Sequence, residues 1–335
     1  MQVPGLRLDA RTMVRVIAAT LALSAPAAVS AAAAWKPEQA IEIIVGTSAG
    51  SGSDTTGRWI HRWVREKKLI ETPVNVLNKP GGGGVVGLVY LNQYAGNGHY
   101  LLVTSPSMLT NHITGRTPLK YTDTTPLGQL GAESVVFTVR SESPIKSAKE
   151  LAERLKADPA SLSFSIGVAV GSHNHIATAQ VAKAMGADIR KLKVVAFSGS
   201  ADGITALLGG HIDVAASPGS AVVAHVKAGR LRMLAVSAEQ RLGGELSSVP
   251  TWKELGIPAV AANWRSVVGP RGMSEPQVQY WDDVFGRLAR LPEWKQDLEA
   301  KLVENTYLNS RDTRRLMDAQ HAELTAVLTE LGLTK

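Results

Sequence analysis

The sequence of 335 residues contains no cysteine. Without cysteine the chain has no disulfide framework, no thiol nucleophile and no thiolate metal site. It also has no N-terminal thiol that could carry a thioether-linked lipid, so we expect no lipid anchor of that kind. Aromatic residues are scarce as well, and Trp59 and Trp63 recur at helical spacing. That spacing favours a helix core over a cofactor site.

The sequence also lacks a dense cluster of charges of one sign. The formal net charge is +7, and removal of residues 1–34, with three Arg and one Asp, leaves +5. A mild positive excess helps to attract anionic ligands. It is far from the dense Lys/Arg patch with interleaved aromatics that nucleic-acid binding needs. We therefore expect no nucleic-acid partner.

The N-terminal segment has the pattern of an export signal. Arg7, Arg11 and Arg15 precede an apolar run over 16–23 and then an Ala-rich tract that reaches Ala34. This order of charged, apolar and small residues is typical of a cleavable secretory signal peptide. The apolar run is short for a membrane span, so a retained anchor is the less favoured alternative. We assign residues 1–34 to a signal peptide and expect a periplasmic protein.

The stretch IEIIVGTSAGSGSDTTG, residues 41–57, organises the rest of the chain. The β-branched run over 41–45 predicts a strand, and Gly46, Gly50 and Gly52 then alternate with Ser and Thr. Asp54 stands where the N-cap of the following amphipathic helix is expected. Small residues at such a turn let a ligand approach the backbone, and the helix N-terminus favours negative charge. The stretch therefore predicts an anion-binding turn.

The same alternation of strand, polar loop and helix continues along the chain. Further strands are expected at 73–77, 99–104, 135–139, 162–167, 192–197, 212–215, 231–236 and 260–269. Most of them end in loops of Gly, Ser, Asn or His, and helices over 278–288, 292–302 and 313–331 close the chain. This order predicts an α/β fold with mostly parallel sheets flanked by helices, and ligand binding at the carboxyl ends of the strands.

Catalytic patterns in the opening loop are incomplete. GTSAG, residues 46–50, matches the G-x-S-x-G nucleophile elbow with Ser48 as nucleophile. That elbow normally follows several strands and precedes an acid and a His, whereas here it follows the first strand and no downstream residue marks a triad. An exported serine hydrolase that uses Ser48 stays an alternative. The favoured interpretation has no catalytic residue.

Cofactor and metal patterns also fail. The glycine spacing lacks the Tyr-x-x-x-Lys pair of short-chain dehydrogenases, and no Gly-Lys-Ser/Thr follows it as in a phosphate loop. His173 and His175 are two residues apart without a carboxylate cluster, which favours helix capping or a hydrogen bond to a ligand. We expect neither cofactor nor metal.

Several ordered segments resemble the solute-binding receptors of tripartite tricarboxylate transporters, often called the Bug family. The resemblance covers nearly all of the chain after residue 34. The matching segments, in order, are Ala49–Asp54, Asn78–Gly84, Gly98–Leu102, Gly171–His173, Phe197–Gly199, Gly209–Ala216, Lys227–Arg232 and Val249–Thr251. Phe197-Ser198-Gly199 stands where the family has a Tyr-Lys-Gly-like turn, so a cation is lost there.

The resemblance implies a two-domain periplasmic-binding-protein fold of the Venus-flytrap, type II-like kind. Residues 35–135 plus 261–335 would form domain 1 and residues 136–260 domain 2. It implies a monomeric receptor, not an enzyme, that binds a di- or tricarboxylate, an acidic amino acid or an aromatic acid between the domains. The receptor would deliver this anion to integral-membrane permease subunits. A carboxylate-sensing adaptor without transport is a further alternative.

Carboxylates in such receptors are held by backbone N–H groups, hydroxyls and ordered waters. The first domain would contribute Ser48, Ala49, Gly50, Ser51, Gly52, Ser53, Asp54, Ser105 and Ser107. The second would contribute Gly171, Ser172, His173, Asn174, Phe197, Ser198, Gly199, Ser200 and Ser217. Arg265 is open between ligand binding and a surface ion pair.

Overall fold

The structure is a computed structural model that describes Met1 and residues 34–166, 169–197 and 199–335. The predicted signal peptide therefore lies almost wholly outside the described residues, and so does Ser198. Within the described part, no helix is both long enough and apolar enough to span a membrane.

The first half of the chain alternates strands and helices as predicted. Its elements are β1 (Ile41–Val45), α2 (Gly52–Glu66), β2 (Val74–Asn78), α3 (Val85–Asn92), β3 (Tyr100–Thr104) and α4 (Ser107–Ile113). β1 lies between β2 and β3 and pairs with both in parallel. Its apolar residues are buried because helices cover both faces of a parallel sheet. The short helix α4, which no pattern indicated, directly follows the loop at Ser105.

The second half repeats the pattern. It consists of β4 (Thr124–Arg140), α5 (Ala148–Ala157), β5 (Ser163–Ser165), α6 (His173–Ala184), β6 (Lys193–Val195), α7 (Ser200–Leu208), β7 (Val214–Pro218), α8 (Gly219–Lys227) and β8 (Leu231–Val236). β5 pairs in parallel with both β6 and β7. β9 (Ala262–Pro270) and the helices α9 (Glu275–Arg290), α10 (Pro292–Ala300) and α11 (Ser310–Glu330) follow.

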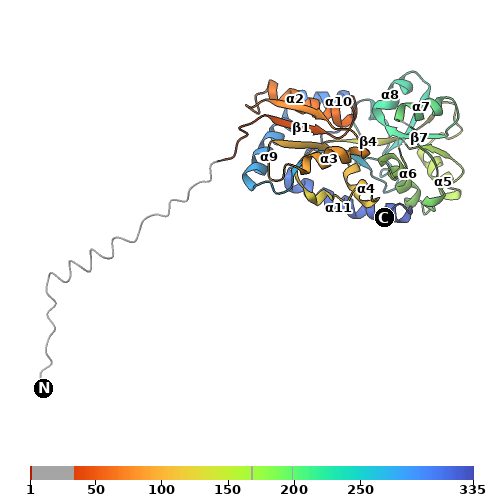
Figure 1. The fold of residues 1–335 in the computed structure, drawn as a ribbon. Coiled ribbons are helices and arrows are strands. Elements are labelled where there is room, and N and C mark those ends of the chain that lie inside the picture. The colour runs from red at the N-terminus through yellow and green to blue at the C-terminus, as the bar shows by residue number, and fades with distance from the viewer. Residues whose placement is uncertain (2–33, 167–168, 198) are drawn as a thin grey trace. The chain divides into compact units, whose positions relative to one another are not determined.

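β4 connects the two halves. Its residues 124–134 pair antiparallel with β9, and its residues 135–140 pair antiparallel with β7 or β8. The strand order is β2-β1-β3-β9-β4-β7-β5-β6, with β8 also on β4. In Figure 1, α2, α3, α9 and α10 gather around the β1 end of this order, and α5 to α8 around the β7 end. The sheet is therefore mixed, with antiparallel strands between two parallel sets.

The sequence prediction of a strand over 135–139 is too short. β4 begins at Thr124, and its pairing with β9 shifts register twice, between Pro126 and Gly128 and between Gln129 and Gly131. Proline and glycine break the alternation of a regular strand and are found at such bulges. The residues that form the bulges therefore concealed the first half of the strand.

The C-terminal helices pack against both halves. Trp281 and Phe285 on α9 and Trp294 on α10 are fully buried in one core with Trp63 of α2. α11 packs on β4 and α4, as expected for a helix that returns to the first domain, and it also contacts α6. There Gln180 Nε2 donates to Glu323 Oε1 at 2.5 Å. The predicted domain boundaries at 135/136 and 260/261 stay a prediction.

Candidate ligand-binding site

The loops at the strand ends of both halves line one cavity of about 760 Å³. The predicted site residues that line it are Gly50, Ser51, Gly52, Ser53, Ser105, Ser107, Gly171, Ser172, His173, Asn174, Gly199 and Ser200. These residues lie in four separate segments of the chain, so the fold brings together what the sequence places up to 150 positions apart.

Five predicted residues do not line the cavity. Ser48 and Ala49 are exposed at the tip of the first loop, and Phe197 is half-buried. Ser217 is buried in β7 opposite Val136 of β4. Asp54 is buried behind the first loop.

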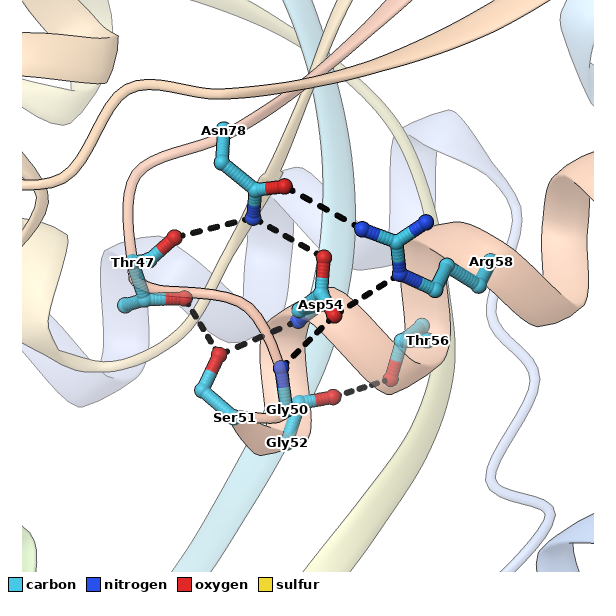
Figure 2. A network of polar contacts seen from close by, with 8 residues as sticks. All are labelled: Thr47, Gly50, Ser51, Gly52, Asp54, Thr56, Arg58 and Asn78. Atoms are coloured by element: carbon cyan, nitrogen blue, oxygen red, sulfur yellow. Dashed lines mark hydrogen bonds and ion pairs between the residues drawn. The ribbon is translucent and has the colours of Figure 1, made fainter.

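The carboxylate of Asp54 holds the first loop in place through hydrogen bonds (Figure 2). Its carboxylate accepts hydrogen bonds from Gly50 N at 2.8 Å, Asn78 Nδ2 at 2.8 Å and Arg58 Nε at 2.9 Å. Asn78 also donates to the carbonyl of Thr47 at 3.0 Å. Burial raises the pKa of Asp54, but the hydrogen bonds from Arg58, Gly50 and Asn78 outweigh this and hold the pKa below its ordinary value of 3.8. Asp54 is therefore ionised at neutral pH.

The predicted N-cap of α2 is wrong. Ser51 is the N-cap, and its hydroxyl accepts from Asp54 N at 3.2 Å. Asp54 is the third residue of the helix, one turn further in than expected. The two glycines that flank Ser51 hid the start of the helix, because glycine in the first turn gives no helical signal.

The glycines after β2 allow two loops to touch through their backbones. A side chain on Gly46 would place its Cβ 2.9 Å from the Cα of Gly84. Gly81 to Gly84 all have positive φ, between 58° and 138°. Other residues adopt such conformations only under strain. The run also places the carbonyl of Gly83 on the cavity wall, where it accepts from Asn111 Nδ2 at 3.1 Å.

On the opposite wall, side chains fix the start of α6. Ser172 is the N-cap, and its hydroxyl donates to the carbonyl of Ile166 at 2.7 Å. Gly171 N donates to Nδ1 of His175 at 2.9 Å. Burial lowers the pKa of His175 to about 4, so it is a neutral acceptor at pH 7.

His173 lines the cavity as a neutral group. Burial, with a smaller contribution from the charge of Arg265, lowers its pKa to about 3, and a hydrogen bond with the backbone of Ala261 opposes this shift. Its Nε2 is buried and has no hydrogen-bond partner among the described residues. Among the same residues, no group of three or more His, Asp or Glu is placed to hold a metal ion.

Part of the charged wall was not predicted: the sequence left Arg265 open and did not single out Glu133, Asn263 or Arg116. Glu133, Asn263 and Arg265 line the cavity from the paired strands β4 and β9, and Arg116 lines it from the loop after α4. Glu133 lies opposite Asn263, and Arg265 is two residues away on β9, so alternation places all three side chains on one face. Arg265 Nη2 donates to Glu133 Oε2 at 2.5 Å. The sequence feature that could have indicated these two residues is a single charge within an apolar strand, at positions 133 and 265.

The cavity suits a small anion with a partly apolar body. Besides the seven-residue helix α4 at Ser107, four longer helices of the described chain begin at its wall: α2 at Gly52, α6 at His173, α7 at Ser200 and α8 beside Pro218. Free N–H groups and the helix dipole favour negative charge at each of these ends. Ile166, Ala169 and Ile176 supply apolar wall. No described histidine hydrogen-bonds to Ser48, so the geometry contains no Ser–His pair at the GTSAG loop.

Comparison with known proteins identifies the family. The model of the tripartite tricarboxylate transporter family receptor matches residues 60–333. The chain belongs to this family. A UPF0065 protein of the gbd 5' region of Cupriavidus necator is 30% identical over 327 residues, which cover 96% of each chain.

Solved structures share the fold. A TctC solute-binding protein from Polaromonas, determined without ligand, superposes with a TM-score of 0.77 at 26% identity, over 88% of this chain and 99% of that one. A protein of R. palustris solved with adipate gives a TM-score of 0.74 at 23% identity, over 89% of this chain and 99% of that one. The two-domain periplasmic-binding-protein fold expected from the sequence is thereby confirmed, and receptors of this family are periplasmic solute-binding proteins rather than an enzyme class.

Proposed function

We propose that this receptor captures a small organic carboxylate in the cavity and delivers it to a tripartite membrane permease. The observation that carries the proposal is the convergence of four helix N-termini on a cavity of about 760 Å³. Backbone N–H groups at these ends supply donors without a large net charge, which is how a carboxylate is held reversibly. The relative solved with adipate supports a carboxylate ligand, since its fold is shared.

Binding and release require the two halves to move relative to each other. The cavity wall comes from loops of both halves, and β4 and β9 pass between them. Ligand contacts made from both sides stabilise a closed state, as in hinge-closing receptors. We propose that a monomer in this closed state is what the permease recognises.

The test of ligand class is a thermal-shift screen followed by titration calorimetry. Organic carboxylates should raise the melting temperature, because a ligand that binds only the folded state stabilises it. The amides of the same acids serve as matched neutral controls and should give no shift. A shift with amides or sugars but with no carboxylate would overturn the proposal.

The alternatives are separated by two further measurements. Deletion of the receptor should abolish uptake of the bound acid, whereas a sensing adaptor would leave uptake unchanged. A serine hydrolase would turn over an ester substrate and lose that turnover in Ser48→Ala. We expect no turnover by either form, because Ser48 lies outside the cavity and has no histidine partner among the described residues.

A further inference from the structure

Both terminal nitrogens of the Arg265 guanidinium are already bonded within the protein, whereas its buried Nε has no hydrogen-bond partner among the described residues. Nη2 bonds to Glu133, and Nη1 donates to the carbonyls of Asn263 at 3.1 Å and Trp264 at 3.3 Å. Gly52 presses against it, because a Cβ there would lie 2.7 Å from Nη2. The side chain is only 9% exposed. Its positive charge is thus compensated by Glu133, and a ligand carboxylate placed beside it would also meet the negative charge of Glu133.

One carboxylate oxygen of Glu133 can still accept a hydrogen bond from a ligand in the cavity. An ionised carboxylate accepts up to about four hydrogen bonds. Oε2 accepts from Arg265, whereas Oε1 accepts none from the described residues. The side chain is 16% exposed and lines the cavity. When a ligand displaces water from the cavity, this oxygen loses its solvation unless the ligand itself donates a hydrogen bond.

The helix N-termini and Glu133 therefore favour different groups on one ligand. The helix N-termini favour a carboxylate, and the Oε1 of Glu133, which accepts no hydrogen bond from the described residues, favours a hydrogen-bond donor, most strongly a charged one. We propose that Glu133 is a specificity-determining residue that selects carboxylates bearing a protonated amino group over unsubstituted carboxylates of the same length. This inference rests on the proposed function, because the helix N-termini are taken to hold the ligand's carboxylate.

The experiment compares ligands that differ at one substituent. Affinities of the purified protein at pH 7 are measured by calorimetry for succinate, malate and aspartate, and for glutarate and glutamate. For each carbon-chain length of ligand that binds, the amino acid should bind about tenfold or more tightly than the unsubstituted acid, because a charge-assisted hydrogen bond is gained. Malate should fall between succinate and aspartate, since its hydroxyl can donate a hydrogen bond to Oε1 but brings no charge.

The variant Glu133→Gln should remove this preference. It keeps an oxygen acceptor for Arg265 but loses the negative charge, so the amino acid should weaken about tenfold and the unsubstituted acid should hold or gain affinity. Glu142→Gln is the matched control, because Glu142 also pairs with an arginine, Arg140, but lies outside the cavity with 68% of its side chain exposed. It should change no affinity.

The outcomes separate the inference from the proposed function. Binding of carboxylates with no amino-acid preference, malate as tight as aspartate, or a preference that survives in Glu133→Gln would each overturn the inference and leave the receptor function standing. Binding of no carboxylate would overturn both. If Glu133→Gln does not fold, aspartate is compared with N-acetylaspartate on the unaltered protein, and equal affinities would refute the role of Glu133.

Discussion

Replacement of Asp54 by Asn should show that the binding loop is held in place by a buried charge. The Asp54 side chain is 2% exposed and accepts from Gly50 N and Asn78 Nδ2, both at 2.8 Å. An asparagine offers one acceptor oxygen and turns an NH₂ group toward the remaining donors. The change is nearly isosteric, so its effect isolates the carboxylate.

The magnitude follows from the two enclosed hydrogen bonds. Hydrogen bonds to a charged group contribute about 1.5–3 kcal/mol each, and an unsatisfied buried donor adds a desolvation cost. One of the two bonds can persist in the variant, which gives an expected loss of about 2–4 kcal/mol in the free energy of unfolding. Arg58 is 55% exposed, so solvent screens its bond and it is left out of this sum. At roughly 2 °C per kcal/mol for a chain of this size, the melting temperature should fall by roughly 4–8 °C.

The assay is thermal unfolding of both forms at several pH values. The native pKa of Asp54 lies below 3.8, so its stabilising effect is complete well above that value and is lost as pH falls through the native pKa. The difference between the two forms should therefore be full at pH 7 and shrink below pH 3.8. Asp283→Asn is the control, because Asp283 pairs with Arg287 at the same helical spacing but is 66% exposed. Equal small losses in both variants, or a difference that persists in acid, would refute the anchoring role.

Three other outcomes are expected. Ser200→Pro removes a backbone N–H at the first residue of α7, a position that tolerates proline, so carboxylate affinity measured by calorimetry should fall about tenfold, whereas Ser200→Ala should lose at most a few-fold. Gly46→Ala sets a Cβ 2.9 Å from the Cα of Gly84 and should cost about 1–3 kcal/mol in denaturant unfolding, while Gly243→Ala, with open space around it, should cost almost nothing. Because the pKa of His175 falls from 6.5 to about 4, the unfolded chain binds a proton that the native chain does not; stability should decline as pH drops from 6.5 toward 4, and less steeply in His175→Gln.

The regular part of the fold could be predicted because its signals are local. The strand expected over 231–236 is β8 in the structure, and the apolar run over 41–45 is β1. Both have β-branched and aliphatic residues bounded by glycine or proline. The first half of β4 was not predictable in this way. It is defined by pairing with β9, about 135 residues later, through bulges at Pro126 and Gly131 that erase the local pattern.

The site residues likewise separate into those with a local sequence signal and those that only long-range strand pairing brings together. Loops such as Gly50–Ser53 were found because small polar residues between a strand and a helix already indicate exposed backbone donors. Glu133 and Arg265 were not assigned together, because each is a single charge in its own segment and only the register of β4 on β9 makes them neighbours. Arg265 was left undecided between ligand binding and a surface ion pair. The structure shows a buried ion pair with Glu133 on the cavity wall, and ligand binding by Arg265 stays a prediction.

The loops at the helix N-termini and the charged residues on β4 and β9 should therefore affect ligand binding in different ways. Loops such as those at Gly52 and Ser200 belong to opposite halves, so the proposed closure would change the distance between them. β4 and β9 connect the halves, and the pair that Glu133 forms with Arg265 lies within these paired strands. A preformed charge pattern adds little reorganisation cost to binding. Loop variants should therefore weaken all carboxylates by a similar factor, whereas variants at 133 should change the ratio between ligands, and a loop variant that altered this ratio would contradict the separation.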